Sequence, residues 1–255
     1  MDTFRRLFIV AALAGLISGA FITVVHEVST SKIILAAEVF ENGSAAEPAA
    51  TTESVAPAAP STAAAPVAEA AEGEGHDHDA HDEEAWGPED GAERMLYTAL
   101  ADVLTGIGFS LLLVAAYRIW GGQITWRTGL YFGLGGFAAI FLSPNLGLPP
   151  EVPGTEAAEL LARQVWWIST AVMTAAGLAM IFFGKRAWLA ALGLIVIVLP
   201  HAYGAPQPAE FGSVAPEALA HRFIVAATIG GLLFWSVLGA TTGFFYSRFF
   251  KDAAA

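Results

Sequence analysis

The sequence predicts an all-α integral membrane protein with about six transmembrane helices and a long disordered, acidic, His-containing loop between the first two. Hydrophobic residues make up 55% of the 255-residue chain and charged residues only 14%, against about 25% charged residues in an ordinary soluble domain. The apolar residues gather in runs that approach bilayer length. The segment between the first two runs is instead acidic and rich in Ala and Pro.

Six runs approach the roughly 20 apolar residues that a transmembrane helix requires. Because lipid offers the backbone no hydrogen-bond partners, each run should be helical. The third and fifth runs are short, so five spans are an alternative. A five-span model would break the pattern in which basic residues lie at the cytoplasmic ends of the spans, so we expect six. The runs are residues 7–25, 99–119, 128–143, 165–184, 187–199 and 223–246.

The chain accordingly divides into a first transmembrane helix (1–25), an extracytoplasmic loop (26–94) and a five-helix transmembrane region (95–255). The first run has the basic start of a signal peptide. However, it is longer than a usual signal core and no A-x-A site follows directly, so we expect it to be retained.

Basic residues favour the cytoplasmic side of a membrane. Six crossings with both termini in the cytoplasm place eight of the twelve basic residues inside. These are Arg5, Arg6, Arg118, Arg127, Lys185, Arg186, Arg248 and Lys251.

The loop at 26–94 contains 16 acidic and two basic residues. Its middle, 44–75, is rich in Ala, Pro, Thr, Ser and Glu, and cannot bury enough apolar surface to offset chain entropy, which predicts a disordered linker. The preceding stretch, 32–41, is expected to form a short amphipathic helix on the membrane.

A His/Asp segment follows the linker, with three imidazoles and five carboxylates in nine residues. Imidazole and carboxylate groups bind divalent ions, and this spacing brings several of them within reach of one ion without a preformed fold. The alternative is a solvated acidic linker with incidental histidines. The ligands do not choose between cobalt, nickel, zinc and copper. The candidate metal ligands are His76, Asp77, His78, Asp79 and His81.

Further candidates lie at the outer ends of the spans. His26, His201 and His221 could converge at a mouth that passes an ion inward, or each could be an ordinary interfacial residue. Asp102 lies near the start of the second span, where a charge is costly and usually faces a cavity or a partner.

Thr105 lies three residues beyond Asp102 on the same helical face and could add an oxygen ligand along a transport path. Gln164 is a weaker candidate for the same cavity. The alternative for Asp102 is a headgroup position and an ion pair with Arg163 or Arg94.

Small residues four apart let membrane helices approach closely. Three such pairs lie in the spans, and Trp235, within the sixth span, is expected to pack against another helix. The pairs are Gly15 with Gly19, Gly129 with Gly133, and Gly239 with Gly243.

Several function classes are not expected. The formal net charge is −12, so no nucleic-acid partner is expected, because phosphate binding needs a basic surface. The absence of cysteine excludes disulfides, thiolate metal sites and cysteine nucleophiles. No nucleotide-hydrolysing or hydrolase motif stands out, so we expect neither an enzyme nor a bound cofactor.

Several segments resemble the CbtA family of predicted cobalt-transporter subunits. They are RRLFIVAALAGLISGAF, ILAAEVFE, HDEEAWGPEDGAERMLYTALADVLTGIGFSLLL, LSPNLGLPPEVPG, RQVWWISTA and LPHAYGAPQP. The resemblance covers the chain except the Ala/Pro linker. It implies five or six spans, cobalt uptake linked to cobalamin synthesis, and a small partner, CbtB, with a histidine motif. It supplies no established ligand residues, and Asp102 stands where the family usually has an amide.

Together these observations predict an inner-membrane subunit for the uptake of divalent cobalt, fed by the His/Asp segment and surrounded by membrane lipid. The alternatives are a non-transporting metal-binding or accessory protein, such as a sensor or assembly partner, and an importer of another ion such as nickel or zinc.

Overall fold

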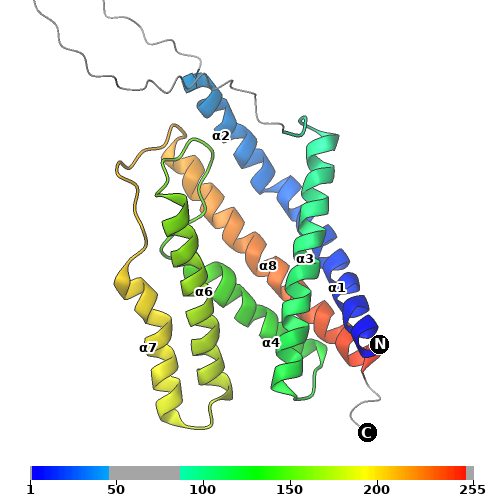
Figure 1. Ribbon diagram of the computed structural model, residues 1–255. Helices are drawn as coiled ribbons and strands as arrows, with labels where there is room; N and C mark the ends of the chain where they lie inside the picture. The colour runs from blue at the N-terminus through cyan, green and yellow to red at the C-terminus, as the bar shows by residue number, and fades with distance from the viewer. Residues whose placement is uncertain (1, 46–86, 251–255) are drawn as a thin grey trace, which may run out of the picture.

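A computed structural model describes residues 2–45 and 87–250 (Figure 1). These residues are helical throughout apart from connecting loops, with one isolated β-bridge between Thr155 and Ser213, so the all-α class is confirmed for the described ranges. The helices are α1 (Asp2–Val28), α2 (Thr30–Ala45), α3 (Ala92–Trp120), α4 (Trp126–Gly136), η1 (Phe137–Leu142), α5 (Ser143–Asn145), α6 (Leu160–Phe183), α7 (Ala187–Tyr203) and α8 (Glu217–Phe249).

Four of the six predicted spans form helices that are long and apolar enough to cross a membrane. They are Thr3–Val28 of α1 and the whole of α3, α6 and α8. The predicted fifth span is α7, an apolar helix of 17 residues. The predicted third span is the continuous helical segment 126–145, which is divided among α4, η1 and α5. Six spans are therefore not established by helix length alone.

The segment 126–145 changes its hydrogen-bond pattern at η1, which is π-helical. The Ser143 N–H donates to the carbonyl of Ala138, five residues earlier. Pro144 follows directly and has no N–H to donate, and its ring crowds the preceding turn of a regular α-helix. The proline therefore gives a physical reason for the wider turn that precedes it.

Helices α1 and α3 lie side by side, α4 packs along α8, and α6 pairs with α7 (Figure 1). Both ends of the described chain lie at one end of the bundle, together with the turns 121–125 and 184–186. Helix α2 and the loops 146–159 and 204–216 lie at the opposite end, which we call the α2 end. Arg6 ties the two chain ends together by donating a hydrogen bond to the Phe249 carbonyl.

The predicted glycine contacts are confirmed. A Cβ atom added to Gly15 would lie 2.4 Å from the backbone nitrogen of Ile107 in α3. The pair Gly129 and Gly133 of α4 faces the pair Gly239 and Gly243 of α8, so the two backbones touch without intervening side chains. Small residues thus allow close approach of α1 to α3 and of α4 to α8.

Buried aromatic rings fill the space between α3, α4 and α8. Trp235 is 3% exposed, and its ring centroid lies 4.7 Å from that of Phe109 in α3. The prediction that Trp235 packs against another helix is therefore confirmed.

A second, smaller core lies at the α2 end. Ile33 and Ala37 of α2 pack against Val152 and Ala215 from the two loops and against the first turns of α8. The helix predicted at 32–41 is confirmed and is longer than expected. With α1 reaching Val28 and α3 beginning at Ala92, helices occupy both ends of the segment 26–94 that the sequence predicts as a loop. The predicted linker lies almost wholly outside the described residues.

Candidate functional site: polar clusters between the helices

Asp102 is held between α1 and α3 by two side chains of α1. Its Oδ2 accepts a hydrogen bond of 2.9 Å from Thr23 Oγ1 and lies 3.2 Å from His26 Nδ1. Thr23 and His26 are three residues apart and so share one face of the helix. Gly19, one turn earlier, lets α1 touch the backbone of Val103, which brings the carboxylate within reach of both partners.

The Asp102 cluster is partly accessible. The Asp102 side chain is 15% exposed and that of His26 is 32% exposed. A carboxylate oxygen, an imidazole nitrogen and a hydroxyl oxygen thus meet between two helices of membrane-spanning length. Such N and O donors suit divalent first-row metals.

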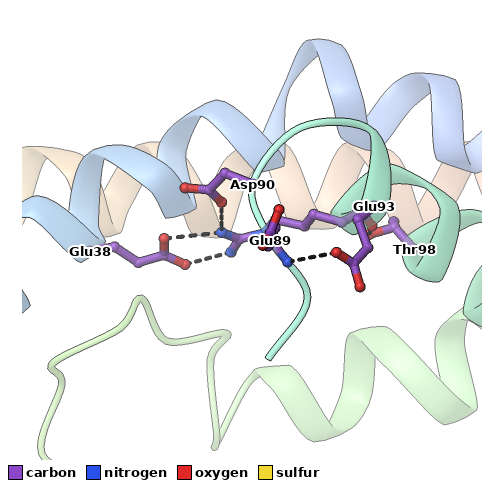
Figure 2. Close-up of polar contacts among 6 residues, drawn as sticks. Glu38, Glu89, Asp90, Glu93 and Thr98 are labelled. Atoms are coloured by element: carbon purple, nitrogen blue, oxygen red, sulfur yellow. Dashed lines mark hydrogen bonds and ion pairs between the residues drawn. The ribbon is translucent and has the colours of Figure 1, made fainter. Parts of the chain in front are cut away.

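The predicted alternative, an ion pair of Asp102 with Arg94 or Arg163, is wrong. Arg94 donates to Glu38 of α2 and, at 2.9 Å, to Asp90, and Figure 2 shows both carboxylates reaching one guanidinium. Arg163 instead donates to Glu151 at 2.8 Å. Arg94 lies in the first turn of α3, two helical turns from Asp102, which is about 12 Å along the helix axis. Its guanidinium pairs with the nearer carboxylates of Glu38 and Asp90 instead.

The surroundings of Arg94 also fix the start of α3. Figure 2 shows the Glu93 carboxylate accepting a hydrogen bond from the Glu89 backbone N–H, at 3.3 Å, and Thr98 beside the first turn. Thr98 Oγ1 donates to the Arg94 carbonyl at 2.9 Å. The polar contacts at this position therefore join α2 to α3.

His201 belongs to a second cluster, formed by α5, α6 and α7. Its Nε2 lies 3.0 Å from Ser143 Oγ, which is 2.8 Å from Thr174 Oγ1. Trp166 places its ring edge-on to the imidazole, with centroids 5.8 Å apart, and donates to the carbonyl of Pro200 at 3.3 Å. The imidazole is therefore oriented by a hydroxyl on one side and an indole on the other.

One further hydroxyl lies near this cluster. Thr170 is fully buried one turn before Thr174, and its Oγ1 has no hydrogen-bond partner within the described part of the chain. The η1 turn ends directly at Ser143, and π-helical turns often lie at functional sites. This second cluster thus combines a half-buried imidazole with buried hydroxyls and lies at an irregular helix.

The other candidates are exposed. His221 lies in the first turns of α8 and lines a groove together with Lys32 and Arg222. Thr105 on α3 and Gln164 on α6 are also exposed, and neither is a hydrogen-bond partner of Asp102 in the described residues.

The three histidines do not converge, which corrects that prediction. His26 contacts Asp102 of α3, His201 contacts Ser143 of α5, and His221 lines the groove with Lys32 and Arg222. No group of three or more His, Cys, Asp or Glu side chains that could hold a metal ion occurs in the ranges that the structure describes. His76, Asp77, His78, Asp79 and His81 lie outside those ranges.

Sequence reasoning missed Thr23, Ser143, Thr170 and Thr174. Thr23 could have been found, because it lies one turn before His26 on the face that carries the histidine. The other hydroxyls carry no comparable pattern, since single Ser and Thr residues are ordinary in membrane helices, where they often bond their own backbone.

The long apolar helices indicate a multi-pass membrane protein, and polar side chains between such helices are typical of transport proteins. A family model described as "Probable cobalt transporter subunit (CbtA)" matches residues 4–247, so the chain belongs to the CbtA family, as the sequence segments indicated. Membership in a transporter family points away from an enzyme and implies further subunits. No curated protein and no solved structure matches the chain.

Proposed function

We propose that this protein is the membrane subunit of a transporter that takes up divalent cobalt across a bacterial inner membrane and supplies cobalamin synthesis. The family match over residues 4–247 carries this proposal. The Asp102 cluster supports it, because a carboxylate inside a membrane helix usually serves an ion path.

Six crossings are the topology that we propose. The segment 126–145 has 20 helical residues, or about 30 Å of helix, which matches the hydrocarbon core. Helix α7 has 17 residues, the lower limit for a span. Six crossings also account for the two chain ends lying together at one end of the bundle (Figure 1).

We place that end in the cytoplasm. The turn between α3 and α4 is flanked by Arg118 and Arg127, and the turn between α6 and α7 contains Lys185 and Arg186. Arg5 and Arg6 begin α1 at the same end. Positive charge on short connections favours the cytoplasmic side, so the α2 end faces outward.

The proposed ion route begins at the outward face. The His/Asp segment, with His76, His78 and His81, raises the local cobalt concentration. His26 and Asp102 then offer an imidazole and a carboxylate between α1 and α3. His201, with Ser143, forms a second polar station between α5, α6 and α7.

A partner subunit can add metal ligands to these clusters. Within the described residues, each cluster contains only one imidazole and no more than one carboxylate. Cobalt bound by imidazole prefers several such donors, and the small CbtB subunit, with its histidine motif, is a suitable source. The same shortage of ligands favours the second candidate function, an accessory or metal-sensing membrane protein that does not transport by itself.

Reconstituted vesicles separate the two functions. Vesicles that contain only this protein are expected to accumulate radiolabelled cobalt above empty vesicles, and competition by nickel, zinc and magnesium identifies the preferred ion. If folded protein binds cobalt in detergent but gives no uptake above empty vesicles, transport by this subunit alone is wrong and the accessory function is favoured.

The His/Asp segment has its own test in the same vesicles. Replacing His76, His78 and His81 together by Ala is expected to lower uptake at low cobalt and to change it little at high cobalt, because the segment concentrates the ion without forming the path. Equal uptake by wild type and variant at every cobalt concentration would remove the gathering role.

A further inference from the structure

Helices α1, α2 and α8 enclose a groove at the α2 end of the bundle. Its volume is about 670 Å³, within the range of about 300–1,000 Å³ that is usual for small-molecule sites. Its wall is mainly apolar and includes Val25 of α1 together with Val225 and Ile229 of α8. Val225 and Ile229 are exposed, so the groove opens on the outer surface of the helix bundle.

Two cations line the groove. Lys32 of α2 and Arg222 of α8 both line it and are both exposed. Neither forms an ion pair with another residue in the described part of the chain, whereas Arg94 and Arg163, at the same end of the bundle, are both paired with carboxylates. Two unpaired cations at one groove, on a chain with net charge −12, indicate an anionic occupant.

The apolar part of the groove extends along α8 from Arg222 toward the middle of the bundle. Arg222 and Ile229 are seven residues apart on α8, about 10 Å along the helix. Gly230 forms part of the lining, where an added Cβ would lie 3.7 Å from Ile22 and 3.8 Å from Val25. The glycine thus leaves room that a larger side chain would fill.

We propose that this groove binds an anionic phospholipid. The phosphate lies between Lys32 and Arg222, and one acyl chain lies along Val25, Val225 and Ile229. The groove joins α8 to the α1–α2 pair, so a bound lipid would hold α2 at the start of α8. Because Lys32 and Arg222 repel a divalent cation, His221 beside them serves the groove and not the metal path.

This assignment follows from charge and shape together. A zwitterionic lipid fits the apolar wall equally well but gains little from two cations, whose attraction to an anionic headgroup is favourable. A helix of a partner subunit could also cover the apolar wall. Its binding would not make the groove prefer an anionic lipid over a zwitterionic one. The preference between two lipids that differ only in headgroup therefore tests the proposal.

The absence of cysteine allows a single fluorophore to report on the groove. Val225→Cys places the label in the groove, and Val172→Cys on α6, also exposed, places it on a different surface. The labelled full chains are reconstituted in phosphatidylcholine vesicles that contain a minor fraction of brominated phosphatidylglycerol or brominated phosphatidylcholine, whose bromines quench nearby fluorophores.

We expect the apparent affinity from quenching at position 225 to be about tenfold higher for phosphatidylglycerol, from two cations that each favour an anionic headgroup, and equal for the two lipids at position 172. Lys32→Gln with Arg222→Gln should abolish the preference at 225, and Lys185→Gln with Arg186→Gln should retain it. Equal quenching by both lipids at position 225 would overturn the proposal and would favour a protein partner as the occupant. A preference that survives in the Lys32→Gln, Arg222→Gln variant would also overturn it.

Discussion

Replacing Gly129 by Ala is expected to separate α4 from α8 and to destabilise the protein severely. The added Cβ would lie 2.3 Å from the carbonyl oxygen of Gly239 and 2.7 Å from the Cα of Gly243. Both are backbone atoms, so no side chain can rotate away and a whole helix must move. Overpacking costs about 1–3 kcal/mol where side chains can adjust, and a backbone contact places this variant at the upper end.

The measurement is thermal unfolding of the detergent-purified protein, followed by loss of the monodisperse peak in size-exclusion chromatography. Gly135→Ala is the matched control on the same helix, because an added Cβ there meets nothing within 4 Å. Alanine is the better helix former by about 1 kcal/mol, so this control should be neutral or stabilising. Equal stability of Gly129→Ala and Gly135→Ala would show that α4 and α8 do not touch through these glycines.

Removing the Asp102 carboxylate is expected to cause the largest loss of cobalt uptake among variants that remain folded. Asp102→Ala removes a ligand and leaves Thr23 and His26 without their shared partner. Loss of a group that merely orients a metal ligand lowers affinity about 10–100-fold, so loss of a direct ligand should lower apparent cobalt affinity by at least about tenfold.

Asp102→Asn tests whether the charge itself binds the ion. The amide oxygen can still accept the hydrogen bond from Thr23, so the contact between α1 and α3 should persist while uptake falls nearly as far as in Asp102→Ala. Thr105→Ala, one turn along α3 and exposed, should leave uptake unchanged. Normal uptake by Asp102→Asn would show that the carboxylate acts only through its hydrogen bonds.

The helix positions could be predicted closely from the sequence. A bilayer-length run of apolar residues has few alternatives to a helix in lipid, and the long runs appear as α1, α3, α6 and α8. The two short runs were also located correctly. Their irregularity was not predicted, because a π-helical turn such as η1 depends on how Pro144 and the neighbouring helices share the space around one backbone segment.

The polar clusters were predicted only in part. Asp102, His26 and His201 were identified as unusual residues, since charge or imidazole is costly in an apolar run. Their partners were not identified, and the proposed meeting of three histidines was wrong. Arg94 was a plausible partner for Asp102 by sequence distance, yet Glu38, from a helix far earlier in the chain, occupies it.

The sequence by itself determined the place of the apolar helices, the glycine faces on which they pack and the accumulation of acid between the first two. These properties depend on the residues of one segment and on the lipid around it, so a single segment is enough to predict them. Only the tertiary structure decided which polar groups meet. Thr23 and Asp102 are 79 residues apart, and Ser143 and His201 are 58 apart. Their contacts depend on the distances and crossing angles of packed helices, which no single segment contains.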